Sequence, residues 1–376
     1  MEKLYTVIGL MSGTSGDGVD LSVIKTDGKD VFTSVSDKFY DYPDRIKKVY
    51  HTLTEKINDK SDLENLKAEI NDFERVLTLF NAEIIKDVLK NYSKKIDFIG
   101  YHGQTIYHNS KEKISRQLGN GLLLSKLLNI NVIYNFRQND IVNGGQGAPL
   151  TPIFHSLLSK KINLQSCIIL NIGGILNATT ILENKKFFAT DIGPGMCLID
   201  KWIRLNSKMK YDKEGIISSK GKIQINLNME LDNFYYYEKK TLNENYIKSF
   251  SINDFDISFV RGLSLENGAA TLVEYTAKII FDYYLYILKI TEESNSTPKL
   301  ILCGGGRKNK YLLKRLLVNF DRYSNMINLI DEFGINGDFV ESQAFGYLAI
   351  RSYLNLPITF PNTTGCDKEC SGGTLI

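Results

Sequence analysis

The sequence repeats one order of structural elements in its two halves, and this repeat restricts the fold more than any other feature. Residues 5–10 form an apolar run typical of a buried strand, and a Gly-rich turn and two further predicted strands follow, up to residue 35. Residues 167–170 form a second such run, and the chain again continues through a glycine turn and two predicted strands, up to residue 190. Each half therefore opens with strand, glycine turn, strand, turn and strand.

The similarity continues beyond these strands. In each half a long helical stretch leads into another apolar strand with a polar or Gly-rich turn, and a last strand leads to a helix. Duplicated units of this kind predict an α/β fold of two similar actin-like (ribonuclease H-like) lobes, residues 1–160 and 161–376, with a nucleotide cleft between them. The matching segments are helices 63–91 and 265–290, strands 96–100 and 299–303, strands 131–134 and 327–330, and helices 151–158 and 340–353.

Composition narrows the class of protein. A chain of 376 residues is longer than one ordinary hydrophobic core accommodates, which indicates two domains. Its net charge of +3 predicts no nucleic-acid partner. Basic clusters such as Arg307, Lys308 and Lys310 are interpreted as solvated surface. The chain has no apolar run long enough to span a membrane and no secretory signal, so we expect a cytoplasmic protein without a membrane partner. The five cysteines show no zinc-site spacing.

The first Gly-rich turn is a candidate phosphate cradle. Phosphoryl transfer requires mainly positioning and charge stabilisation, and glycines let backbone N–H groups approach phosphate oxygens. A simple hairpin turn is the alternative for this turn and for Gly173 and Gly174 in the second half, but their matching positions favour two phosphate clamps. The predicted ATP-binding residues in the first turn are Gly13, Thr14, Ser15, Gly16, Asp17, Gly18, Val19 and Asp20.

Asp191 is the candidate catalytic residue. It ends the third predicted strand of the second half, before a Gly-Pro-Gly turn and an amphipathic helix at residues 196–205. A carboxylate there is well placed to accept a proton from a hydroxyl group or a water molecule. The alternative is that Asp191 only caps the turn.

Residues 135–149 are dense in hydrogen-bonding side chains, as sugar recognition requires, although an ordinary surface loop is the alternative. We predict that Arg137, Asp140 and Gln146 bind the substrate. Gln104, on the corresponding first-half turn, is a further candidate. Its neighbours His102 and His108 are interpreted either as substrate contacts or as turn residues.

Two further segments bear on ligand binding. Gly304, Gly305 and Gly306 follow a predicted strand and would let an adenosine moiety pack against the backbone; a helix entry loop is the alternative. Glu341 lies in the last predicted helix, where it is either a ribose or substrate contact or a solvated residue.

Together these motifs resemble the anhydro-N-acetylmuramic acid kinase family of the sugar-kinase/actin superfamily. They follow the family's order over most of the chain, and the motifs at 9–20 and 135–149 are specific to the family within the superfamily. The matching stretches are GLMSGTSGDGVD (9–20), HGQT (102–105), NFR (135–137), GGQGAP (144–149), NIGG (171–174), DIGPG (191–195) and CGGG (303–306).

The resemblance implies an unusual double reaction. Water opens the 1,6-anhydro bridge of the sugar at its anomeric carbon, and the released O6 takes the γ-phosphate of ATP to give N-acetylmuramic acid 6-phosphate in cell-wall recycling. Asp191 would activate the water, and residues 13–20 would bind the ATP phosphates. Mg²⁺ is expected with ATP, although its ligands are not legible.

The chain departs from the family pattern at two positions. Family members usually carry a bulky apolar residue where this chain has Gly16, and Asn where it has Met196. These departures concern the rigidity of the phosphate turn and a polar contact beside Asp191. Residues 363–365 are the candidate counterpart of the family's C-terminal ending.

Three other functions compete with this one. A kinase of another 1,6-anhydro sugar, such as levoglucosan, would differ only in the sugar pocket. A nucleotide-binding actin-like protein without turnover would have no need of a base at Asp191. A glycosidase would need a second carboxylate and would leave the phosphate turns unexplained. A homodimer is left open.

Overall fold

The structure, a computed structural model, describes residues 3–184, 186–224, 250, 252–291 and 297–376. The chain forms two compact units, Met1–Leu157 together with Phe339–Ile376, and Leu158–Asp338. This division differs from the expected residues 1–160 and 161–376: the boundary falls after Leu157, and the C-terminal segment from residue 339 packs with the N-terminal half.

The first unit contains a seven-stranded sheet with the order β12-β6-β4-β1-β2-β3, and β5 pairs with β4. The β1–β2 and β2–β3 pairs are antiparallel, whereas β1–β4 and β4–β6 are parallel. The strands are β1 (Tyr5–Ser12), β2 (Gly18–Thr26), β3 (Phe32–Asp41), β4 (Phe98–Asn109), β5 (Ile114–Leu118), β6 (Asn131–Tyr134) and β12 (Thr374–Leu375). The helices are α1 (Asp44–Lys56), α2 (Lys60–Asn65), α3 (Lys67–Asn91), α4 (Gly121–Leu128), α5 (Gln138–Val142), α6 (Pro152–Lys161), which runs across the boundary, α11 (Val340–Tyr353) and α12 (Pro361–Thr364).

The second unit contains a five-stranded sheet with the order β11-β10-β7-β8-β9. Its strands are β7 (Cys167–Ile172), β8 (Ile175–Ile181), β9 (Phe187–Pro194), β10 (Lys299–Cys303) and β11 (Ile327–Leu329). The helices are α7 (Cys197–Asn206), α9 (Leu265–Thr291) and α10 (Lys310–Phe320). Short 3₁₀ turns are η1 (Lys213–Gly215), η2 (Ser218–Lys220), η3 (Ile252–Asp254), η4 (Ser258–Val260), η6 (Gly305–Lys308), η7 (Asp321–Met326) and η8 (Ile330–Phe333).

The two sheets share one topology. In the second unit β7–β8 and β8–β9 are antiparallel, and β7–β10 and β10–β11 are parallel, which repeats the pattern of β1, β2, β3, β4 and β6. A meander of three strands followed by two parallel strands is the ribonuclease H-like arrangement. The predicted α/β fold with two similar lobes is therefore confirmed.

Alternating residues of β1 explain how the first sheet is covered. Ile8 and Leu10 point into a core that includes Phe73 and Leu77 of α3. On the opposite face a side chain at Gly9 would collide with α11, because its Cβ would lie 1.9 Å from the Ser342 carbonyl oxygen. The helix thus packs directly on the strand backbone.

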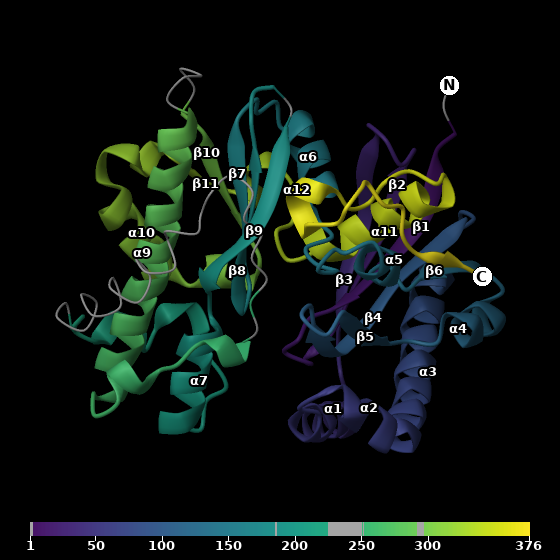
Figure 1. The fold of residues 1–376 in the computed structure, drawn as a ribbon, viewed down its shortest axis with the longest axis horizontal. Coiled ribbons are helices and arrows are strands. Elements are labelled where there is room, and N and C mark those ends of the chain that lie inside the picture. The colour runs from purple at the N-terminus through teal and green to yellow at the C-terminus, as the bar shows by residue number, and fades with distance from the viewer. Residues whose placement is uncertain (1–2, 185, 225–249, 251, 292–296) are drawn as a thin grey trace. The chain divides into compact units, whose positions relative to one another are not determined.

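This close packing is the physical reason that the C-terminal segment belongs to the first unit. Gly100 on β4 likewise faces the Phe345 carbonyl, 2.2 Å from where its Cβ would be. After α11 the chain ends in β12, which pairs with β6. In Figure 1 these yellow C-terminal elements lie beside the purple and blue strands of the N-terminal half.

Candidate functional site

The first Gly-rich turn connects β1 to β2 and is held through its carbonyl groups. Gly16 has a φ of 66°, in the left-handed region, and its N–H donates to the Gly13 carbonyl at 3.2 Å. Gln104 Nε2 donates to the same carbonyl at 2.8 Å, and the Tyr50 hydroxyl donates to the Thr14 carbonyl at 3.2 Å. These carbonyl groups therefore point into the protein.

The backbone N–H groups at the tip of the turn, unlike its carbonyl groups, are not hydrogen-bonded within the described part of the protein. Within the described ranges, the N–H groups of Thr14 and Ser15 donate to no protein acceptor, and both side chains are exposed. The Asp17 side chain is exposed as well. A turn with its carbonyls directed inward and its amides left free is suited to bind an anion.

The last residues of the predicted phosphate motif lie in β2 and not in the turn. Gly18 pairs with Asp41, and Asp20 pairs with Met11. The Val19 side chain has 0% exposure within the hydrophobic core. The Val19 side chain therefore cannot reach a nucleotide, because the sheet and its helices enclose it, and the prediction that this segment binds ATP stays a prediction.

Three predicted segments of the second unit come together: the turn between β7 and β8, the turn after β9 and the glycine segment after β10. The N–H groups of Gly195 and Met196 donate to the carbonyls of Gly174 and Gly173, each at 2.9 Å. A Cβ at Gly306 would lie 2.9 Å from Cγ of Met196. The structure thus joins residues that are more than a hundred positions apart in the sequence.

Some glycines in these turns are not explained by the packing of the protein itself. A Cβ at Gly305 would meet nothing within 4 Å, and at Gly173 and Gly174 the nearest atoms would be 3.5 and 3.7 Å away. None of the three has a positive φ. No described residue fills the space beside Gly305, and at Gly173 and Gly174 a Cβ would make only ordinary van der Waals contacts, so a ligand could approach the backbone closely at these turns.

Asp191 lies on β9 with both carboxylate oxygens engaged. Asn177 Nδ2 donates to Oδ1 at 2.9 Å, and the Phe250 N–H donates to Oδ2 at 2.8 Å. Neither donor belongs to the following turn, so the carboxylate does not cap it. Burial raises the pKa of Asp191 to about 6, although both hydrogen bonds lower it. Such a group is ionised at neutral pH yet accepts a proton more readily than an ordinary aspartate, as a general base must.

Sequence reasoning missed Asn177 as a site residue. It stands on β8 directly opposite Asp191 on β9. The available signal was an amide side chain within an otherwise apolar or hydroxyl-bearing strand, but only the strand register places it beside the carboxylate.

Arg137, immediately before α5, is held by His102 and Gly147. Its Nε and Nη2 donate to His102 Nε2 at 3.2 and 2.9 Å, and Nη1 donates to the Gly147 carbonyl at 2.6 Å. His102 Nδ1 lies 2.8 Å from the Gly103 carbonyl. This arrangement assigns the proton to Nδ1 and leaves Nε2 as acceptor, so His102 is neutral. Burial, and then the charge of Arg137, hold the pKa of His102 well below its usual value.

Arg137 retains binding capacity beyond these contacts. Its guanidinium carries five N–H groups, and those left over from the three bonds above have no acceptor in the described part of the chain. Burial lowers the pKa of Arg137 to about 10, so it is still charged at neutral pH. The charge of Glu341, on the first turn of α11, favours this charged form.

Glu341 is partly buried and accepts no hydrogen bond from a described residue. Burial raises the pKa of Glu341, and Arg137 lowers it. An incompletely paired carboxylate near a cation is suited to bind the hydroxyl groups of a ligand. The prediction that both residues contact the substrate stays a prediction.

Asp140 and Gln146 shape the loop that supports Arg137. Asp140 is buried, and its carboxylate accepts from the Thr364 hydroxyl at 2.6 Å and from the Gly147 N–H at 2.7 Å. The Gln146 N–H donates to the Thr364 carbonyl at 2.9 Å. Asp140 therefore anchors this loop within the protein, and the prediction that it contacts the substrate stays a prediction.

Gln104 and His108 each keep one buried polar atom without a partner among the described residues, Oε1 and Nε2 respectively. The Gln104 amide lies under the phosphate turn through its bond to Gly13. His108 Nδ1 lies 2.9 Å from the Ser115 hydroxyl, and burial lowers the pKa of His108 to about 4.

Arg307 fixes the glycine segment after β10. It makes two bonds to Asp331, at 2.7 and 2.8 Å, and its Nη1 donates to Asp338 at 2.6 Å and to the Gly304 carbonyl at 3.0 Å. The Gly304 N–H in turn donates to the Gly337 carbonyl at 3.1 Å. Arg307 is only 5% exposed, so its interpretation as a solvated cation was wrong.

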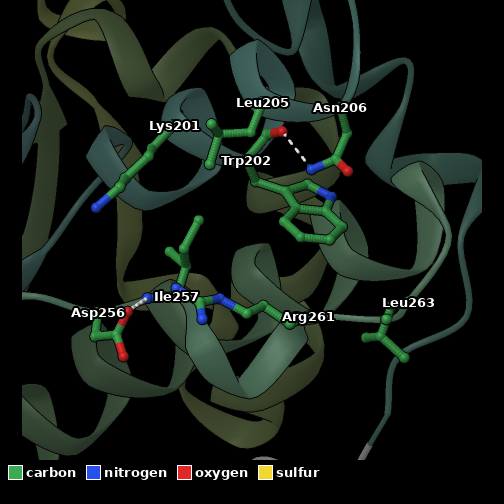
Figure 2. Close-up of a pocket in the computed structure, with 9 residues that line it drawn as sticks. Lys201, Trp202, Leu205, Asn206, Asp256, Ile257, Arg261 and Leu263 are labelled. Carbon is green, nitrogen blue, oxygen red and sulfur yellow. Dashed lines mark hydrogen bonds between the residues drawn. The ribbon is translucent and has the colours of Figure 1, made fainter.

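A hollow of about 380 Å³ in the second unit contains none of the predicted site residues. Figure 2 shows the side chains of Lys201 and Arg261 and the ring of Trp202 among the residues that line it. Trp202 Nε1 already donates to the Leu265 carbonyl at 2.9 Å. The lining residues are Lys201, Trp202, Leu205, Asn206, Asp256, Ile257, Arg261, Gly262 and Leu263.

Among the residues described, no group of three or more His, Cys, Asp or Glu side chains is placed to hold a metal ion. None of the helices described is long and apolar enough to cross a membrane.

Comparison with known proteins gives a consistent result over the whole chain. Residues 5–376 match the family model described as anhydro-N-acetylmuramic acid kinase. A protein of that name from Pelagibacter ubique (strain HTCC1062) is 48% identical, covering 100% of this chain and 99% of its own length. Another of that name from Brucella canis is 35% identical over 100% of both chains. The solved structure of ethanolamine utilization protein EutJ from Carboxydothermus hydrogenoformans is 11% identical, covers 92% of this chain and 89% of its own, and has a TM-score of 0.36.

Proposed function

The chain belongs to the anhydro-N-acetylmuramic acid kinase family, and from this premise we propose that it converts 1,6-anhydro-N-acetylmuramic acid, water and ATP into N-acetylmuramic acid 6-phosphate and ADP. The reaction would serve peptidoglycan recycling. The observation that carries the proposal is the Asp191 carboxylate, held by two N–H donors with a pKa of about 6.

Asp191 is proposed as the general base. Its carboxylate takes a proton from water as the water oxygen bonds to C1 of the sugar, and the C1–O6 bond breaks. O6 then bonds to the γ-phosphorus while the bond from that phosphorus to the β,γ-bridging oxygen breaks, so ADP leaves. The proton on Asp191 passes to solvent. The donors Asn177 and Phe250 hold the carboxylate in one orientation throughout.

ATP is proposed to bind to the Gly-rich turns. The free Thr14 and Ser15 N–H groups would bind phosphate oxygens, as would the backbone at Gly173 and Gly174. The open backbone at Gly305 would accommodate the adenosine moiety.

The site residues also fit Mg²⁺ bound with ATP. Such Mg²⁺ commonly uses one or two carboxylates together with phosphate oxygens and water, so a cluster of three protein ligands is not needed. The exposed carboxylate of Asp17, within the phosphate turn, is the protein ligand that we propose. When bound, the ion neutralises charge on the phosphates.

Arg137 and Glu341 are proposed to bind the sugar. The lactyl group of the muramic acid substrate carries a carboxylate, which needs a cationic partner, and the remaining N–H groups of Arg137 could supply it. Levoglucosan has no such group, so a charged and incompletely paired Arg137 favours the anhydromuramic acid over that alternative.

The proposal is tested by ADP release from the purified protein with MgATP and each of three sugars: 1,6-anhydro-N-acetylmuramic acid, levoglucosan and N-acetylmuramic acid. The expected product is heavier than the anhydro sugar by one water and one phosphoryl group. A product lacking the added water, turnover of levoglucosan only, or ATP binding without turnover would each reject it.

We further propose a cytoplasmic homodimer, which cell fractionation and light scattering would test.

A further inference from the structure

Tyr50, on α1, fills the space beside Gly16 of the phosphate turn. A Cβ at Gly16 would lie 2.2 Å from Cδ1 and 2.4 Å from Cε1 of the Tyr50 ring. The ring is buried, with 3% exposure. Since Gly16 also has a φ of 66°, a side chain at position 16 is disfavoured both by the backbone and by this ring. The ring thus occupies the volume that a side chain at position 16 would need.

The hydroxyl of the same residue reaches the turn from below. It lies 3.2 Å from the Thr14 carbonyl and 3.1 Å from the Thr105 carbonyl, and these two acceptors share its single proton. Burial raises the pKa of Tyr50 to about 12, so the phenol is protonated, and remains a donor, across the physiological range. Tyr50 therefore joins the turn to β4.

Two neighbouring carbonyls of the turn are consequently held by two side chains from different elements. Gln104 on β4 donates to the Gly13 carbonyl at 2.8 Å, and Tyr50 on α1 donates to the next carbonyl, that of Thr14. A peptide group is planar, so fixing the Thr14 carbonyl also fixes the direction of the Ser15 N–H on the opposite side. That N–H is one of the free donors of the turn.

We propose that Tyr50 is a positioning residue for nucleotide binding: its ring supports Gly16 and its hydroxyl orients the Thr14–Ser15 peptide so that the free N–H groups meet phosphate oxygens. The inference rests on the proposed function in that it takes this turn to bind the phosphates of ATP. It also gives a physical reason for the glycine at position 16.

The first test is Tyr50→Phe, which keeps the ring and removes the hydroxyl. The matched control is Tyr284→Phe, because the buried Tyr284 hydroxyl donates to the Pro298 carbonyl at 3.1 Å in the second unit. We expect Tyr50→Phe to raise the KM for ATP and the Kd for MgADP by about 3- to 10-fold, because the free N–H groups of the turn would lose their fixed orientation. The KM for the sugar should change less than about 2-fold.

The control separates positioning from simple loss of stability. Both variants should lower the Tm to a similar extent, and only Tyr50→Phe should weaken nucleotide binding. An unchanged Kd for MgADP in Tyr50→Phe, or equal weakening in both variants, would overturn the inference.

The second test exchanges volume between positions 16 and 50. Gly16→Ala should weaken MgADP binding strongly in the wild-type background and less in a Tyr50→Leu background, where the ring is absent. Gly262→Ala is the control for the backbone cost alone, because Gly262 has a φ of 86° and a Cβ there would meet nothing within 4 Å. Additive effects of Gly16→Ala and Tyr50→Leu would contradict the steric part of the inference.

These readouts keep the two hypotheses apart. If the wild-type protein binds MgADP but turns over no anhydro sugar, the proposed function fails, and the effect of Tyr50→Phe on the Kd still decides the inference. If the wild type is active and Tyr50→Phe binds MgADP normally, only the inference fails. A wild type that binds no nucleotide would reject both.

Discussion

Asn177 and Asp191 face each other across the antiparallel strands β8 and β9, with Nδ2 of the amide 2.9 Å from Oδ1 of the carboxylate. The contact stabilises the ionised carboxylate and opposes the effect of burial, which raises its pKa. The amide therefore helps to set the pH range in which the proposed base can accept a proton.

Asn177→Ala should move the activity profile to higher pH. Loss of the hydrogen bond removes a contact that lowers the pKa of Asp191, so the acidic limb of kcat, expected near pH 6, should rise by about one pH unit. The measurement is kcat between pH 5 and 8.5. Asn206→Ala, which removes an amide bonded to the Trp202 carbonyl, serves as the control and should leave the limb in place. A limb that does not move in Asn177→Ala would count against Asp191 as the titrating base.

Asp191→Asn should reduce turnover by roughly 10²-fold or more, because it removes the proton acceptor. Nucleotide binding should be nearly intact, since the phosphate contacts that we propose come from backbone groups. Steady-state kinetics and calorimetric titration with MgADP check the two statements separately. Turnover at the wild-type level would exclude the assigned role.

The same substitution should alter how stability depends on pH. Burial raises the pKa of Asp191 in the folded state above its usual value, to about 6, so its contribution to stability is complete below pH 4 and is lost as the pH rises through 6. Wild type should therefore lose about 1 to 3 kcal/mol relative to Asp191→Asn between pH 4 and 7. Urea unfolding at both pH values measures this difference. A wild type that gains relative stability over that interval would show the opposite sign.

Arg137→Lys should raise the KM for the sugar by about 10-fold or more, because an ammonium cannot reproduce the bonds of a guanidinium to His102 and Gly147 and still reach a ligand. The KM for ATP should stay within about 2-fold. Arg116→Lys is the control, since Arg116 pairs with Glu74 at 3.1 Å in the same unit. Equal changes in the KM values for both substrates would argue for a general structural defect.

Arg307→Lys should weaken nucleotide binding and lower the free energy of unfolding by about 1 to 3 kcal/mol, because the bonds to Asp331, Asp338 and Gly304 cannot all be kept. Asp331 and Asp338 are partly exposed, which limits the cost. Chemical denaturation and MgADP titration are the measurements. The control is Arg315→Lys, at a pair with Glu274, which should lower stability without affecting nucleotide binding. A loss of binding in that control would show that lower stability alone can explain the effect of Arg307→Lys on nucleotide binding.

The sequence by itself determined the local and periodic features of this protein. Apolar strands, their glycine turns and the helix after residue 340 follow from spacing and residue type, and the repeated order of elements predicted two sheets of one topology, as the structure shows. It also predicted that Asp191 and the turn at residues 13–17 belong to the site, because a carboxylate at a strand end and a dense glycine turn are local patterns.

Only the tertiary structure decided which distant residues meet. It placed α11 on β1 because Gly9, which has no side chain, lets the helix backbone approach the strand. No local sequence pattern predicts this contact. It turned Asp140 and Val19 inward, placed Asn177 beside Asp191 through strand register, and brought Tyr50 against Gly16. The physical reason is that strand and helix periods act over a few residues, whereas hydrogen-bond partners and packing depend on how separate segments come together.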